Sequence, residues 1–208
     1  QTLSHCERSV LRGSRASGRR VGRRFGHRSR VVVLRVDLGY RANLESKVTV
    51  EEAKQDLDRL FANMRHKPSL FGDLLLVIWR HQVGYEGNHH FHLLLFYTND
   101  HLNVESYRAE LLGEYWRDVI TKGRGAFFSC HRADYIGKFG DRLALGKIDH
   151  DDLDKRFNLL SIIAYFCKGK QLVRGRTQTL GFREMFEPAN DRRGRPRESD
   201  VRPIDYLR

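Results

Sequence analysis

Residues 73–97 of this chain run DLLLVIWRHQ, VGYEGN and HHFHLLLFY, and they give the clearest structural signal in the sequence. The first and third parts are rich in aliphatic, β-branched and aromatic side chains, a composition typical of strands. The short connection between them contains two glycines, which favours a β-hairpin. The stretch therefore predicts two antiparallel strands, at residues 73–82 and 89–97.

Other elements flank this hairpin on both sides. Residues 31–38 (VVVLRVDL) are apolar enough for a strand that is buried on at least one face. Thr49 and Glu52 form a capping-box pattern ahead of a helical apolar repeat, which predicts an amphipathic helix over residues 50–65. After the hairpin, we expect a helix over residues 103–120, a strand over 125–131 and a helix over 152–168.

This order of elements indicates the fold class. Strand, helix, strand, strand, helix, strand is the split βαβ arrangement of ferredoxin-like α+β folds. We expect an antiparallel sheet with the 89–97 strand in its interior and the first two helices on one face. The last helix is then free to cover the opposite face.

Charge is concentrated at one end of the chain. The net charge is +12, and residues 1–30 alone hold nine arginines and one glutamate. We expect a flexible arginine-rich arm over 1–30, one folded domain over 31–186 and a charged tail over 187–208. Nucleic acid is the polyanion that such an arm fits best; the alternative is a solvated tail that only aids solubility. The arginines expected to contact DNA are Arg19, Arg20, Arg23, Arg24, Arg174 and Arg176.

Composition excludes two classes of protein. The three cysteines are too few and too scattered for a disulfide framework, and none lies in a CxxC motif. No apolar run approaches the ~18–20 residues that span a bilayer. We therefore expect a cytoplasmic protein with no membrane partner.

His90 and His92 lie two residues apart in the predicted 89–97 strand. Because side chains alternate along a strand, both imidazoles project from one face, and Phe91 projects from the other. Two neutral imidazoles on a rigid strand suit a divalent metal. The alternative is a pair of polar residues on a partly exposed strand.

A third metal ligand depends on the register of the hairpin. If the connection is centred on Glu86, Gln82 lies opposite His90 on the same face. If Glu86 and Gly87 form a two-residue turn, His81 faces His92 and Gln82 turns away. The residues alone leave both registers open.

The last predicted helix carries Tyr165 and Lys168, three residues apart on one side. They belong to a polar stripe beside an apolar stripe of Phe157, Leu160, Ala164 and Cys167. Tyr165 is a candidate nucleophile whose phenolate Lys168 would favour; the alternative is simple packing with a snorkelling lysine. Tyr135 and Lys138 repeat the same spacing and form a competing pair.

Taken together, these blocks resemble the HUH endonucleases, the family of rolling-circle replication initiators and relaxases. The stretches RVVVLRVDLGY, LLLVIWRHQVGYEGNHHFHLLLF and AYFCKGKQ are similar to those of inovirus replication initiator-like proteins with the YagK/YfjJ C-terminal domain. The resemblance covers roughly residues 30–182.

The resemblance implies a nickase that acts on single-stranded DNA or an origin hairpin in a bacterial host cell. His90, His92 and Gln82 would hold Mg²⁺ or Mn²⁺, Tyr165 would form a 5′-phosphotyrosine with the cut strand, and Lys168 would assist. Related initiators commonly have Glu where this chain has Gln82, which favours the first register. A host helicase is a further partner that the family uses.

Two other functions fit the same fold. One is an RRM-like module that stacks bases on its sheet, although two histidines lie where stacking rings would be expected. The other is a repressor that retains DNA binding without catalysis.

Overall fold

A computed structural model describes residues 30–42, 44–84, 87–98, 105–167 and 179–184. These residues form one six-stranded sheet in the order β4-β1-β3-β2-β6, with β5 paired to the other part of the β1 edge. Every neighbouring pair of strands is antiparallel. The strands are β1 (Arg30–Tyr40), β2 (Leu74–Val83), β3 (His89–Tyr97), β4 (Gly125–Ser129), β5 (Gly146–Asp149) and β6 (Thr179–Glu184).

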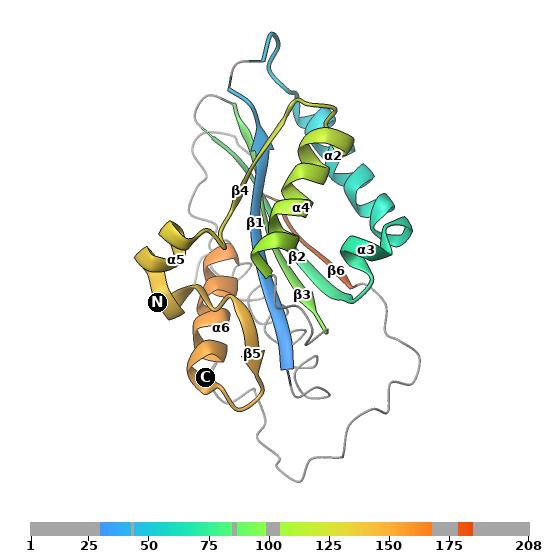
Figure 1. Cartoon of the computed structure of the whole chain (residues 1–208). Helices are drawn as coiled ribbons and strands as arrows, with labels where there is room; N and C mark the ends of the chain where they lie inside the picture. Colours follow the sequence, from blue (N-terminus) through green and yellow to red (C-terminus); the bar gives the residue numbers. More distant parts are fainter. Residues whose placement is uncertain (1–29, 43, 85–86, 99–104, 168–178, 185–208) are drawn as a thin grey trace, which may run out of the picture.

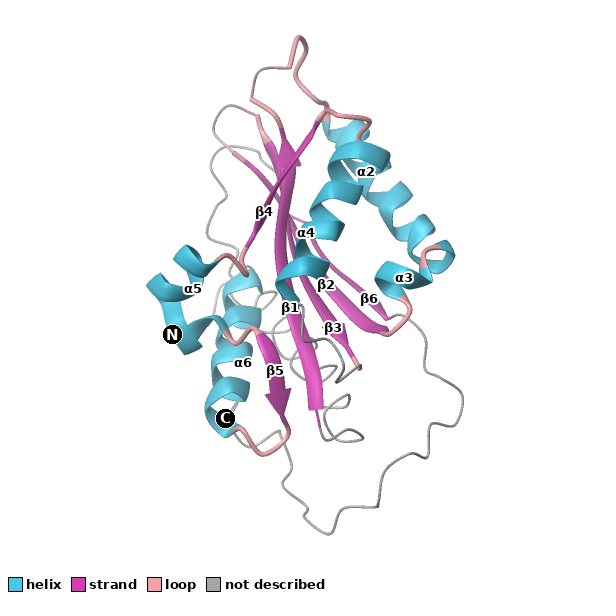
Figure 2. Ribbon diagram, viewed as in Figure 1, coloured by secondary structure: helices cyan, strands magenta, loops and turns pink. Residues whose placement is uncertain are grey.

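Helices connect these strands (Figure 2). The α-helices are α2 (Val50–Asn63), α3 (Pro68–Phe71), α4 (Glu105–Tyr115), α5 (Ala133–Phe139) and α6 (Leu153–Cys167). Short 3-10 turns lie at Met64–His66 and Gly140–Leu143, and a π-helical turn (Trp116–Ile120) extends α4. None of the helices in the described ranges is long and apolar enough to cross a membrane.

The sheet has a hydrophobic layer on each face. Figure 1 shows α2, α3 and α4 on one side of the sheet and α6 on the other. The first core joins the even-numbered residues of β1 to α2, α3 and α4. The second joins Val31 and Val33 of β1 to Leu159, Ile163 and Phe166 of α6. The predictions of an α+β fold, of two helices on one face and of a third helix opposite are therefore confirmed.

Local sequence explains where the main elements begin and pair. The Thr49 hydroxyl accepts a hydrogen bond from the Glu52 backbone, and the Glu52 carboxylate accepts one from the Thr49 backbone. This is the predicted capping box at the start of α2. β3 lies between β1 and β2, as expected for the interior strand. In the hairpin, Gln82 pairs with His90 and Arg80 pairs with His92, which is the first of the two predicted registers.

Strand β2 contains a bulge near its start. Leu74 pairs with Tyr97, but Leu76 pairs with Phe96, so one extra residue enters β2 between them. As a result, Leu75 and Leu76 both pack in the core on the α6 side. Beyond the bulge, the strand alternates regularly up to the hairpin.

The structure differs from the sequence-based expectations at α6 and at the sheet edges. The stripe of α6 that packs on the sheet is Leu159, Ile163 and Phe166, so the predicted apolar stripe was wrong, and its first member, Phe157, is 62% exposed. Because α6 is apolar on several sides, spacing alone could not select the packed one. The short β5 and the late β6, which extend the sheet at its two edges, were not predicted.

Candidate active site

Two rows of side chains cross the sheet on the face that α6 covers. In the first row, Asp37 of β1 lies opposite His92 of β3, which lies opposite Arg80 of β2. His90 lies two residues from His92 on the same face, and it pairs with Gln82. The structure therefore brings together His90, His92 and Gln82, the three residues that sequence predicted as metal ligands.

Glycines leave room for the His90 ring. A Cβ atom on Gly39 would lie 3.2 Å from His90 Nδ1, and one on Gly84 would lie 4.0 Å from His90 Nε2. The ring thus lies between the ends of β1 and β2, with Nε2 toward the strand that carries Gln82. His90 is exposed to solvent, whereas His92 is half-buried.

Asp37 contacts the second histidine directly. Its Oδ1 lies 2.9 Å from His92 Nδ1 and 3.5 Å from Arg35 Nε. Burial alone would favour the neutral acid, but the close contact with His92 and the charge of that ring, followed by the charge of Arg35, hold the pKa of Asp37 below its ordinary value. Asp37 is therefore a carboxylate at neutral pH. A carboxylate on Nδ1 orients a histidine so that Nε2 is the nitrogen presented to a metal.

Several polar atoms of this group lack good hydrogen bonds. Arg35 Nε, Asp37 Oδ1 and His92 Nδ1 are buried, and within the described ranges none has an aligned hydrogen-bond partner. Their mutual contacts are close enough for ion pairs but are poorly directed. Buried polar atoms are nearly always paired in folded proteins, so this cluster is an exception within the described residues.

The donor set fits a divalent metal, although weakly. Partial desolvation, and then the charge of His92, lower the pKa of His90, so this imidazole is neutral and able to bind a metal at pH 7. Gln82 would add a neutral amide oxygen. In the described part of the chain, no three His, Cys, Asp or Glu side chains are grouped to hold a metal ion. Gln82, which pairs with His90, is the side chain predicted to supply a third ligand.

Tyr165 lies on α6, above the same face. The ring of the next residue, Phe166, lies 6.2 Å from the His92 ring. The Arg35 guanidinium lies 5.5 Å from the centre of the Phe166 ring. Arg80 Nη1 donates a hydrogen bond to the Tyr165 carbonyl oxygen at 3.3 Å. These contacts fix this turn of α6 over the histidines, while the Tyr165 side chain remains 60% exposed. Its predicted partner Lys168 lies outside the described residues, as do Arg19, Arg20, Arg23, Arg24, Arg174 and Arg176.

The competing tyrosine lies near the same place. Tyr135 is on α5, and its ring lies 5.3 Å from the ring of Phe128 at the end of β4. Burial raises the pKa of Tyr135. The charge of Arg35 lowers this pKa, whereas Asp37 and Tyr165 raise it. Burial raises the pKa of Cys130 to about 12, so this thiol is protonated at neutral pH. Both tyrosines therefore remain candidates for chemistry at this face.

The opposite face of the hairpin carries a second pair of histidines. His81 lies opposite Phe91 and therefore faces away from His92. Its Nε2 lies 2.9 Å from Nδ1 of His89, and both rings are buried. The observed register excludes His81 as the third ligand.

Sequence reasoning missed Asp37, Arg35 and Arg80. A signal for the first two was present: Arg35, Asp37 and Gly39 occupy alternate positions in the otherwise apolar stretch VVVLRVDLGY. Because alternate residues share a face, this pattern indicates one polar end on a buried strand.

No family model, no curated protein and no solved structure matches this chain.

Proposed function

We propose that this protein is a metal-dependent endonuclease that nicks and rejoins single-stranded DNA, of the HUH type. The observation that supports the proposal is that His90, His92 and Gln82 lie on the face of the sheet covered by α6, the helix that carries Tyr165. The three side chains come from adjacent paired strands, and Tyr165 comes from the helix packed on that face. An origin hairpin of a rolling-circle replicon is the substrate we propose, and a host helicase is the partner that would unwind the duplex.

The topology supports this assignment. The order β4-β1-β3-β2 with α2 and α4 on one face is compatible with a ferredoxin-like core, to which β5, β6 and α6 are added. In our proposal, the free face of that core holds the histidines on its interior strand. The helix that covers it supplies the nucleophile.

His90, His92 and Gln82 would hold Mg²⁺ or Mn²⁺, with Asp37 orienting His92 through Nδ1. A metal bound there would polarise the scissile phosphate as a Lewis acid. The positive charges of Arg35 and Arg80, which flank His92, would attract the phosphate to the same place.

Tyr165 would attack the phosphorus atom. Its phenolic oxygen forms the new bond to phosphorus, and the bond between phosphorus and the 3′ oxygen breaks. The phenolic proton passes to water, which reaches the exposed side chain, and the leaving 3′ oxygen takes up a proton. The product is a 5′-phosphotyrosine, which keeps the energy of the broken bond for later rejoining.

The test is incubation with circular single-stranded DNA and Mn²⁺ or Mg²⁺, followed by detection of a covalent protein–DNA band. Tyr165→Phe should abolish that band and leave DNA affinity nearly unchanged, because it removes one oxygen and no charge. Tyr135→Phe is the matched control, since its phenol lies near the same face. A band that persists in Tyr165→Phe but is lost in Tyr135→Phe would assign the nucleophile to Tyr135.

A second candidate function is nucleic-acid binding without catalysis. The observation that favours it is the charge of the site, where Arg35 and Arg80 flank His92 and the third ligand is a neutral amide. Such a group could bind a backbone phosphate without a metal. A DNA affinity that is unaffected by EDTA, together with no covalent band at any metal concentration, would support this function instead.

A further inference from the structure

Helix α5 has no buried side chains. Two of its apolar residues, Ile136 and Phe139, are exposed. A short helix with no buried face gains little stability from packing. Its apolar side chains are therefore available to another molecule.

Three aromatic rings form a continuous ledge at this helix. Tyr135 lies 5.3 Å from the ring of Phe128 at a steep angle and 4.7 Å from the ring of Phe139. Phe128 comes from the end of β4 and is 36% exposed, and Phe139 is 38% exposed. We call these three residues the aromatic ledge.

Cations lie over the ledge at both ends. The Arg132 guanidinium lies 5.8 Å from the centre of the Phe128 ring, and the Lys138 ammonium lies 5.4 Å from the centre of the Phe139 ring. Arg132 also pairs with Asp134 at 3.3 Å, but both side chains are well exposed. Aromatic faces with adjacent cations fit a ligand that combines planar rings and negative charge.

The ledge is continuous with the candidate active site. Phe128 of β4 lies directly opposite Asp37 of β1, which lies opposite His92 of β3. Neighbouring strands are about 4.8 Å apart, so Phe128 lies roughly 10 Å from His92 along this row. A strand whose phosphate lay at the histidines would bring a nearby base to the ledge.

We infer that the aromatic ledge stacks an unpaired base of single-stranded DNA next to the phosphate at the histidine site. This inference rests on the proposed function and adds a recognition site to it. Stacking needs a base freed from its partner, so the ledge would favour single strands over duplex. It would be tolerant of sequence, because every base has an aromatic face.

The experiment compares two probes in EDTA, where no metal-dependent cleavage occurs. One is an oligothymidylate, and the other is an abasic strand of the same length, which keeps the phosphates but has no bases. The full-length protein should bind the oligothymidylate roughly tenfold more tightly, the effect of one stacked base. Phe139→Ala and Phe128→Ala should each lose most of this preference while retaining affinity for the abasic strand.

Two further variants make the test specific. Tyr107→Ala removes a 58% exposed aromatic ring from α4, on the opposite side of the sheet, and should keep the preference. Phe139→Trp should also keep it and should show quenching of the added tryptophan fluorescence by oligothymidylate. Thermal melts would show that each variant is folded.

The outcomes separate this inference from the proposed function. If Phe128→Ala and Phe139→Ala keep the base preference in a chain that forms the covalent band, the ledge is not a stacking site and the proposed function stands. If the preference depends on the ledge but no covalent band forms, the proposed function fails and the ledge stands. Self-association that Phe139→Ala abolishes, with no base preference in the parent protein, would identify a second copy as the occupant and overturn the inference.

Discussion

The two faces of the sheet each carry a pair of histidines and a carboxylate, but they use them differently. On the α2 side, His81 and His89 are buried and contact each other. On the α6 side, His90 is exposed, and His92 shares poorly directed contacts with Asp37. Polar groups that satisfy one another stabilise the fold, whereas groups left partly unsatisfied are available to a ligand.

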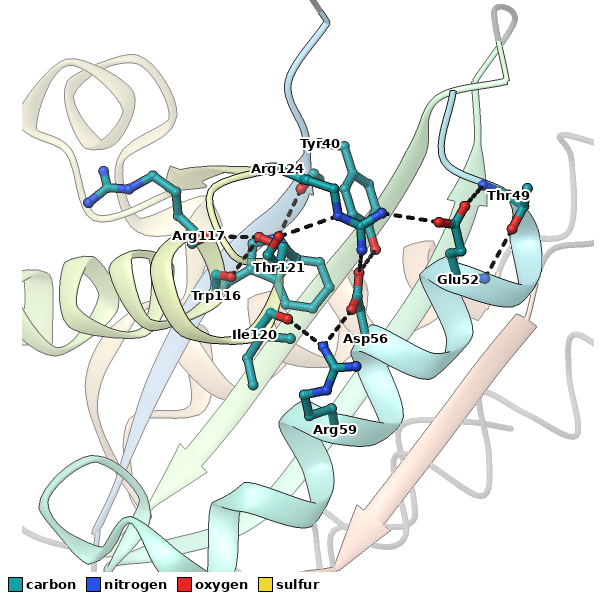
Figure 3. Close-up of polar contacts among 11 residues, drawn as sticks. Tyr40, Thr49, Glu52, Asp56, Arg59, Trp116, Arg117, Ile120, Thr121 and Arg124 are labelled. Carbon is teal, nitrogen blue, oxygen red and sulfur yellow. Dashed lines mark hydrogen bonds and ion pairs between the residues drawn. The ribbon is translucent and has the colours of Figure 1, made fainter. Parts of the chain in front are cut away.

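The carboxylates of the two faces, Asp56 and Asp37, also differ in how fully their partners satisfy them. Asp56 on α2 is 2% exposed, and three partners bind it: the Tyr40 hydroxyl at 2.9 Å, Arg124 at 3.0 Å and Arg59 at 3.1 Å. Figure 3 shows how this network joins α2 to β1 and to the segment after α4, with Glu52 also contacting Arg124. Asp56 with its hydroxyl and arginine partners is a closed structural unit, whereas Asp37 is part of an open one.

The largest expected effect comes from replacing one histidine on each face with alanine and comparing the two variants. His92→Ala should reduce formation of the covalent band by at least about a hundredfold, because a Lewis-acid metal contributes several kcal/mol. The melting temperature should change little. His89→Ala, the matched change on the other face, should lower the melting temperature and leave the cleavage rate of folded protein unchanged. A nicking assay and a thermal melt on both variants check this, and the reverse pattern would show that the faces were assigned the wrong way round.

We expect acid to lower the stability of the fold mainly by protonating buried imidazoles. Burial lowers the pKa of His81 to about 4, with a further contribution from His89, and burial lowers that of His131 to about 4. Both groups bind protons more readily in the unfolded chain, so stability falls as the pH drops from about 6.5 toward 4. At pH 5, each costs about 2 kcal/mol relative to neutral pH.

Urea unfolding at pH 7 and pH 5 measures this loss. His131 Nε2 accepts a hydrogen bond from the Arg35 backbone at 3.2 Å, which is lost on protonation. His81→Phe keeps an aromatic ring that cannot be protonated, so it should reduce the acid sensitivity. An equal loss of stability in His81→Phe would remove this residue from the explanation.

The Asp56 network should matter for stability and not for chemistry. Asp56→Ala leaves the Tyr40 hydroxyl and two arginines without their shared partner, which should cost about 2–3 kcal/mol, since both arginines can still reach water. Urea unfolding gives the loss. The covalent band formed by folded protein should be unchanged, and a variant that folds normally but does not cleave would contradict the structural role.

Asp37→Asn should weaken metal binding and leave the stability of the fold largely unchanged, the opposite of Asp56→Ala. The amide keeps the size of the side chain but loses the charge that orients His92, and loss of a carboxylate that orients a metal-binding histidine typically weakens metal binding by about 10–100-fold. Isothermal titration with Mn²⁺ measures the affinity. A stability loss as large as that of Asp56→Ala, with unchanged metal affinity, would place Asp37 among the structural carboxylates.

The smallest effect concerns the third ligand. Gln82→Glu adds one negative charge opposite His90, which should tighten Mg²⁺ or Mn²⁺ binding by about 1 kcal/mol, roughly fivefold. Gln82→Ala should raise the metal concentration needed for cleavage. Metal titrations of the nicking rate compare the two, and no shift in either variant would exclude Gln82 as a ligand.

The central hairpin could be predicted from sequence because alternation and a short glycine-containing turn are local signals, but these signals left two registers open. Helix α2 could also be predicted, because its start is marked by Thr49 and Glu52. The packed stripe of α6 could not be predicted, because that helix is apolar on several sides and only the sheet selects Leu159, Ile163 and Phe166. Strand β5 has four residues, too few for a period to be visible.

The candidate site divides in the same way. Alternation alone places His90 and His92 on one face, whereas the position of Gln82 opposite His90 depends on the register, which the residues left open and the structure provides. The contact of Asp37 with His92 joins β1 to β3, and the pairing of Asp37 with Phe128 joins β1 to β4, in both cases across segments far apart in the chain. Tertiary pairing of this kind leaves no periodic trace in either segment.

The bulge in β2 has a consequence for how this chain tolerates changes in length. Leu75 and Leu76 share one side, so the alternation of the strand shifts by one residue at that point. The pairing of β2 with β3 near the hairpin therefore determines which face of the sheet Gln82 and Arg80 occupy. The alternation of the first residues of β2 does not determine it, because the bulge separates the two parts of the strand. An insertion or deletion of one residue at the α3 end of β2 can be absorbed by the bulge, whereas the same change within the hairpin would turn Gln82 away from His90.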